Sequence, residues 1–161
     1  MLEEQIRRRL RNKPLLIMTH IVIGYPSFRE SWALARSMVD SGVDLLELQI
    51  PFSEPMADGP VILAANQKAL EAGASVSKCF EFARELAAQV QDPLLFMSYY
   101  NIPFKYGLAR FAADAKSARG RPVWRKRRAA VQTQADQKNI SESGLAAWAN
   151  STSGNETAKK P

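Results

Sequence analysis

Two carboxylates of this chain are candidates for acid/base catalysis. One stands late in an apolar run, and the other lies in the proline-rich loop that follows it. Glu47 stands late in the apolar run 43–50, and Asp58 lies in the following loop, just before Gly59 and Pro60. Alternate side chains of a strand share a face, so Glu47 lies among apolar neighbours and is poorly hydrated. Desolvation favours the protonated carboxyl group, so we expect Glu47 to act as a general acid near neutral pH.

Both acids also have ordinary structural roles open to them. Glu47 could be a core carboxylate paired with an arginine, and Asp58 could cap the helix that begins near Pro60. Spacing alone favours these roles, because acids this close in sequence are common and perturbed carboxylates also occur in structural networks.

Apolar runs and helical patterns alternate along the chain and indicate how these acids are positioned. Strands are expected at 15–23, 43–50 and 94–98, and helices at 3–11, 28–40, 60–71, 76–90 and 105–116. Strict alternation predicts a parallel sheet, and uniformly apolar strands predict one whose outer face is covered by helices. We therefore predict an α/β fold with about three β/α units, for which a β/α barrel fits best. Reactive groups of such a barrel gather at the carboxyl ends of the strands, where Glu47, Asp58 and 99–101 fall.

Charge and apolar composition divide the chain near Ser117. Residues up to Ser117 carry 13 Lys+Arg and 13 Asp+Glu, whereas residues 118–161 carry 9 and 3, so the net charge of +6 lies in the tail. Large apolar residues fall from 44 in the first part to 6 in the tail, which cannot offset its ordering entropy by burial. We expect a barrel-like part, 1–117, and a basic, poorly ordered tail, 118–161, without a strand-like run. The neutral first part excludes a basic nucleic-acid-binding domain.

The cysteine count and the hydropathy of the chain indicate its cellular compartment and exclude some kinds of metal site. Cys79 is the only cysteine, which excludes an internal disulfide and a multi-cysteine metal site and fits a reducing compartment. Residues 1–10 lack the apolar core of a secretory signal, although their arginines leave organelle targeting as an alternative. The apolar run 14–23 is too short to span a bilayer. We expect a cytoplasmic protein.

A longer pattern surrounds the two acids. The run L-E-L-Q-I-P-F-S-E-P-M-A-D-G-P, which ends at Pro60, closely resembles the signature of the tryptophan synthase alpha subunit family. Further matching motifs occur in the expected order, namely I-G-Y-P-S at 23–27, S-G-V-D at 41–44, K-A-L-E-A-G at 68–73, M-S-Y-Y-N at 97–101 and F-K-Y-G-L-A-R-F at 104–111. The resemblance extends over about residues 15–117.

The resemblance implies a (β/α)8 barrel that cleaves indole-3-glycerol phosphate to indole and glyceraldehyde 3-phosphate by a retro-aldol reaction without a cofactor. The family assigns protonation of the indole C3 to the position of Glu47 and the indole nitrogen to that of Asp58. Tyr99 matches a residue that lines the indole pocket. The loop holding Pro51 and Glu54 matches the surface that contacts a beta subunit, itself a pyridoxal phosphate enzyme.

Departures from the family pattern affect what this chain can do. Gln49 replaces a glycine and adds bulk near the pocket. Glu54 replaces an aspartate, which keeps the charge on a longer side chain. We interpret His20, the only histidine, as pocket wall or core. Beyond Ser117 the resemblance stops, and we hypothesise a changed reading frame near 116–119 or a truncated gene. Shifting the frame of the DNA after Ser117 would then restore a fourth family strand.

Because only about three of eight barrel units match, we expect impaired activity. Two other functions remain open. One is a non-catalytic fragment or partner that binds a beta subunit through the loop 51–58. The other is a nucleic-acid binder that uses the basic residues 119–128, although no aromatic platform accompanies that charge and a solvated tail is the better interpretation.

Overall fold

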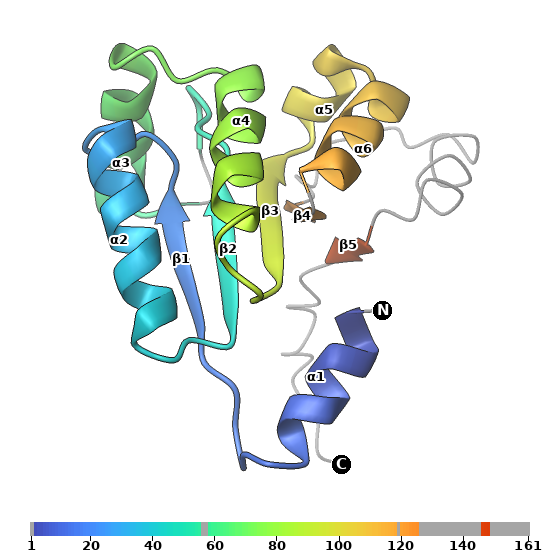
Figure 1. Cartoon of the computed structure of the whole chain (residues 1–161). Coiled ribbons are helices and arrows are strands. Elements are labelled where there is room, and N and C mark those ends of the chain that lie inside the picture. Colours follow the sequence, from blue (N-terminus) through green and yellow to red (C-terminus); the bar gives the residue numbers. More distant parts are fainter. Residues whose placement is uncertain (1, 56–57, 119, 126–145, 149–161) are drawn as a thin grey trace, which may run out of the picture.

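A parallel sheet forms the centre of the molecule. The computed structural model describes residues 2–55, 58–118, 120–125 and 146–148. The strands run in the order β1-β2-β3-β4-β5, with bounds Met18–Val22, Leu45–Gln49, Leu94–Tyr99, Gly120–Arg125 and Ala146–Trp148. The helices are α1 (Leu2–Leu10), α2 (Phe28–Asp40), α3 (Pro60–Glu71), α4 (Val76–Ala87), α5 (Asn101–Tyr106) and α6 (Leu108–Ser117). Strand and helix alternate through β3, which confirms the predicted partial α/β barrel (Figure 1).

Local sequence signals fix where the helices begin. Ser27 caps α2: its hydroxyl accepts a hydrogen bond from the Glu30 backbone N–H at 3.2 Å and donates to the Glu30 carboxylate at 2.8 Å. This is the serine-to-glutamate spacing of a capping box. Ser75 caps α4 in the same way through the Lys78 N–H. At α3 the cap residue is Gly59, with Pro60 in the first turn and no side-chain cap bond, so Asp58 is not the N-cap.

The main core lies between the outer face of the sheet and helices α2, α4 and α6. Leu46, Leu48 and Ile50 of the β2 segment point into it, as the alternation predicted. Phe80 of α4 sits at its centre, 1% exposed. Its ring makes edge contacts with Phe96 on β3, at 5.2 Å between centroids, and with Phe111 on α6, at 4.9 Å. These aromatic contacts hold the second and third β/α units together.

Helix α1 is attached to the end of the sheet opposite the carboxyl ends of the strands (Figure 1). Arg9 binds Asp44, which precedes β2, at 3.3 Å, and Asp92, which precedes β3, at 2.8 Å. Lys13 also binds Asp44, at 2.7 Å, and the Ile17 backbone N–H donates to the other oxygen of that carboxylate. Asp44 thus joins the helix, the β1 segment and β2.

Asp44 makes the stability of this attachment dependent on pH. Hydrogen bonds from Lys13 and from the Ile17 N–H lower the pKa of Asp44 from 3.8 to about 2. A depressed carboxyl pKa contributes stability above the unfolded value, and this contribution is lost as the pH falls through the folded one. Urea midpoints of the protein are therefore expected to fall between pH 4 and pH 2. Asp44→Asn is expected to be less stable at pH 6 and to show a flatter profile in that window; an unchanged profile would contradict this role.

The expectation that no strand follows Ser117 is wrong for two segments. Strand β4 pairs in parallel with β3 from Leu94↔Gly120 to Tyr99↔Arg125, and β5 pairs with β4 over Val123↔Ala146 to Arg125↔Trp148. Strand pairing is carried by backbone hydrogen bonds, so an exposed strand edge accepts a segment whose composition lacks an alternating pattern. The rest of the tail lies outside the described residues, so its expected disorder stays a prediction.

The helix expected at 105–116 is instead two helices. Helix α5 begins at Asn101, directly after β3, and α6 begins at Leu108. Gly107 separates them with φ +94°, a backbone conformation that side chains with a Cβ rarely adopt. The break turns α6 back over the outer face, where Phe111 and Ala115 are buried.

Strand β1 is the outer strand at one end of the described sheet. Apolar side chains around its start are strongly exposed, namely Leu15, Ile17 and Met18. Among the described helices, none combines the length and the hydropathy needed to cross a membrane.

Candidate functional site

The first acid, Glu47, lies in the middle of β2 on the face away from the main core. Parallel pairing places His20 of β1 directly beside it. The His20 Nδ1 and Glu47 Oε2 atoms are 2.7 Å apart, and the side chains are 30% and 17% exposed. Glu47 is thus largely shielded from water, as expected, but its described partner is a histidine rather than an arginine. His20 was interpreted as pocket wall or core, and the structure gives it a polar contact to the predicted acid.

The second acid, Asp58, is brought to the same face through Gln49. Gln49 lies two residues after Glu47, at the carboxyl end of β2, and is completely buried. Its Nε2 donates to the Asp58 carboxylate at 3.2 Å and to Oδ1 of Asn66 on α3 at 3.3 Å. The structure therefore connects both predicted acids to the carboxyl end of one strand.

Asn66 determines which way the Gln49 amide faces. The Asn66 Nδ2 donates to the carbonyl oxygen of Ile62, and its Oδ1 accepts from the Phe52 backbone N–H at 2.9 Å. Since Oδ1 is an acceptor, Gln49 must present its Nε2 there, and the same NH₂ group reaches Asp58. The Gln49 Oε1 atom is buried and has no hydrogen-bond partner among the described residues.

Tyr99 and the loop after β2 complete this end of the sheet. Tyr99 ends β3, is buried, and stacks on Phe52 with ring centroids 5.0 Å apart. Pro51 is buried, whereas Glu54 is exposed. Of the two residues predicted to contact a partner, only Glu54 offers a free surface in this structure.

The arrangement can carry out proton transfer with two unlike acids. Glu47 is shielded on a strand and contacts an imidazole, while Asp58 lies on a loop and accepts an amide hydrogen bond. Two carboxyl groups on one face of a strand can divide the roles of general acid and general base between them. His20 and Asn66 were not predicted as site residues. The register of parallel strands could have revealed His20, since it and Glu47 hold equivalent places in neighbouring strands.

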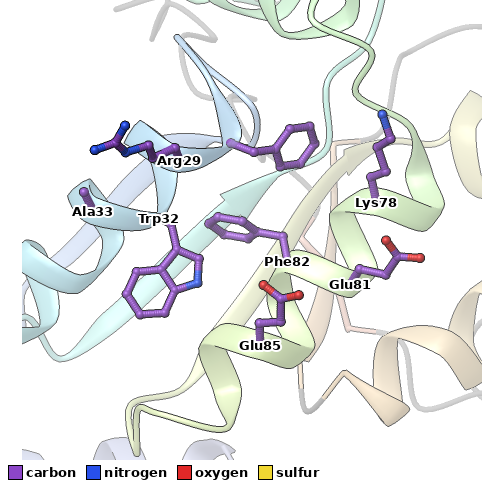
Figure 2. A pocket seen from close by; sticks show the side chains of 8 residues that line it. Arg29, Trp32, Ala33, Lys78, Glu81, Phe82 and Glu85 are labelled. Carbon is purple, nitrogen blue, oxygen red and sulfur yellow. The ribbon is translucent and has the colours of Figure 1, made fainter.

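A separate groove lies on the helical surface between α2 and α4 (Figure 2). Trp32 and Phe82 form its apolar walls, and charged side chains of both helices surround them. Trp32 and Phe82 pack against the main core, on the opposite face of the sheet from Glu47. The groove is therefore distinct from the site of the two acids.

Comparison with known proteins agrees with a partial barrel. The sequence model of the tryptophan synthase alpha chain matches residues 6–123. This chain belongs to the tryptophan synthase alpha chain family. The match is longer at both ends than the resemblance over 15–117 and reaches into β4.

Members of the tryptophan synthase alpha chain family also show how much of a whole subunit is present. The chain is 65% identical over 111 residues to the alpha chain of Desulforapulum autotrophicum, covering 69% of this chain and 44% of that protein. It is 62% identical over 112 residues to that of Syntrophotalea carbinolica, covering 70% and 44%. The chain thus spans less than half the length of these curated relatives.

Solved tryptophan synthase structures share the fold. The Legionella pneumophila alpha subunit aligns with a TM-score of 0.78 and 26% identity, over 90% of this chain and 56% of that one. An aminoacrylate-bound tryptophan synthase from M. tuberculosis aligns with the same score and identity, over 91% and 59%. These structures are family barrels, which supports interpreting the described sheet as one part of a barrel.

Proposed function

We propose that this chain carries the acid pair of the tryptophan synthase alpha reaction, the retro-aldol cleavage of indole-3-glycerol phosphate to indole and glyceraldehyde 3-phosphate. The observation that carries the proposal is the link from Gln49 to Asp58, which brings the loop acid to the face of β2 that holds Glu47. Family membership supplies the reaction, and the geometry supports a shielded strand acid and a loop acid on one face of β2.

In the proposed reaction Glu47 donates a proton to the indole C3, which places a positive charge on the ring nitrogen. The bond from C3 to the glycerol chain then breaks, its electron pair returns to the ring, and the adjacent hydroxyl becomes the aldehyde as it gives its proton to the Glu47 carboxylate. Asp58 accepts a hydrogen bond from the indole N–H and so stabilises the positive charge on the nitrogen. Tyr99, stacked on Phe52, forms one wall of the indole pocket. Turnover by these 161 residues is expected to be far slower than that of a whole subunit, since they correspond to less than half of the relatives' length.

Indole release from indole-3-glycerol phosphate by the purified chain tests the proposal. Glu47→Gln keeps the shape of the side chain but cannot deliver a proton, and loss of a general acid typically costs about 10²–10⁴-fold in rate. We therefore expect indole formation to fall to background, and Asp58→Asn to reduce it strongly. Glu85→Gln, an exposed acid beside the groove, is the matched control and should keep the rate of the parent chain. Equal rates in Glu47→Gln and Glu85→Gln would refute the assignment.

We further propose that the carboxyl ends of the strands also dock a tryptophan synthase beta subunit. Glu54 is exposed on the loop after β2, and Phe104 on α5 after β3 is 66% exposed. Both residues follow the carboxyl ends of neighbouring strands, and aromatic side chains are enriched at interaction surfaces. Co-elution of the chain with a beta subunit, weakened in Phe104→Ala, is expected. Binding without indole release would favour a non-catalytic partner over an enzyme.

A further inference from the structure

The chemistry of the two groups determines which atom is the hydrogen-bond donor in the contact between His20 and Glu47. An ionised carboxylate only accepts hydrogen bonds, so at 2.7 Å from Oε2 the Nδ1 atom of a neutral His20 ring must carry the hydrogen. The other ring nitrogen, Nε2, then holds a lone pair. Among the described residues, no other side chain is hydrogen-bonded to either group.

This direction makes the two oxygens of Glu47 unequal. If Nδ1 keeps its hydrogen when Glu47 is protonated, Oε2 stays the acceptor of that hydrogen bond, and the proton that Glu47 is proposed to transfer is carried by Oε1. A glutamate side chain otherwise rotates about its terminal torsion and can present either oxygen. The backbone supports the contact, because His20 and Glu47 are register partners in neighbouring parallel strands and both side chains leave the sheet on the same face.

The geometry points to His20 as a positioning residue of the acid site: it anchors Oε2 of Glu47 and leaves Oε1 to carry the transferred proton. This inference rests on the proposed function, in which Glu47 is the general acid. His20 acts through Glu47 and takes no part in binding the indole ring. Orientation of this kind matters because small misplacements of a reacting group can cost about 10²-fold in rate.

The ring tautomer tests the contact without any need for turnover. His20 is the only histidine, so the ¹⁵N NMR signals of the imidazole belong to it alone. At a pH where the ring is neutral, the folded chain is expected to show mainly the Nδ1–H tautomer, whereas free histidine prefers Nε2–H. Glu47→Ala removes the acceptor and should restore the Nε2–H preference, while Glu47→Gln keeps an acceptor oxygen and should retain Nδ1–H. A predominant Nε2–H tautomer in the parent chain, or equal populations in the parent and Glu47→Ala, would overturn the inference.

Kinetics test whether the contact serves the reaction. His20→Asn keeps an N–H close to the place of Nδ1, and His20→Phe keeps a ring without a donor. We expect His20→Phe to lower kcat for indole release by about 10–100-fold with little change in KM, and His20→Asn to stay near the parent value. Equal losses in both variants would overturn the positioning role. A chain that shows the Nδ1–H tautomer but releases no indole would refute the proposed function and leave the His20–Glu47 contact established.

Discussion

Phe80→Ala is expected to lower the free energy of unfolding by about 3–5 kcal/mol, the usual cost of truncating a buried phenylalanine. The ring is 1% exposed and touches β3 through Phe96, α6 through Phe111 and α5 through Tyr106. Its removal leaves a cavity between three elements that cannot close without moving one of them. Because small domains are stabilised by only about 5–15 kcal/mol, much of the variant should be unfolded in mild denaturant.

Cys79 provides the measurement for Phe80→Ala. It is the only cysteine, is fully buried, and burial raises the pKa of its thiol to about 12, so a thiol reagent labels it only when the structure opens. Labelling should become fast in Phe80→Ala at urea concentrations that protect the parent chain. Phe104→Ala removes an equally large ring from an exposed position and should label like the parent. Equal protection of Cys79 in both variants would show that Phe80 does not hold the core together.

Asn66→Leu should lower the free energy of unfolding by about 2–6 kcal/mol. The Asn66 Oδ1 is the acceptor for both the Phe52 backbone N–H and the Gln49 side chain. A leucine of similar size leaves both donors without this partner, and each buried unsatisfied donor costs about 1–3 kcal/mol. Asp58 would also lose its fixed orientation, since the Gln49 amide that holds it could then rotate.

Two measurements check the effect of Asn66→Leu. Urea unfolding gives the loss of stability, and hydrogen exchange of the Phe52 amide should accelerate by more than the global loss explains. Gln67→Ala is the matched control, because its side chain lies on the same helix and makes one exposed bond to Glu71. If Phe52 exchanged at the parent rate in Asn66→Leu, the amide network would not support the loop.

Patterns within a single segment predicted much of the fold and of the site. Alternation along β2 placed Glu47 and Leu48 on opposite faces, and the structure agrees: Leu48 is in the core and Glu47 is not. The predicted starts of the helices 28–40 and 60–71 agree with α2 and α3, because the signals for a helix start are local. The position of Asp58 before Gly59-Pro60 suggested a helix cap or a reactive group, and the structure excludes the cap.

Interactions between segments were harder to predict. The His20–Glu47 contact depends on the register of two strands, which side-chain alternation does not specify. Gln49 was predicted to add bulk, but its bonds to Asp58 and Asn66 depend on where α3 packs. Strand β4 was not predicted because backbone pairing to an open strand edge does not require an alternating pattern of apolar residues. The break at Gly107 was missed because one glycine inside a helical pattern is often tolerated.

The free edge of the outer strand β1 affects how the protein can associate with other polypeptide chains. Its free edge is bordered by the exposed side chains of Ile17 and Met18, and in the described sheet only β2 pairs with it. Unpaired amide and carbonyl groups beside apolar side chains make a template on which an extended peptide can add as another strand. An extended strand of a second copy of this chain is therefore expected to pair with this edge, so concentrating the protein is expected to favour self-association.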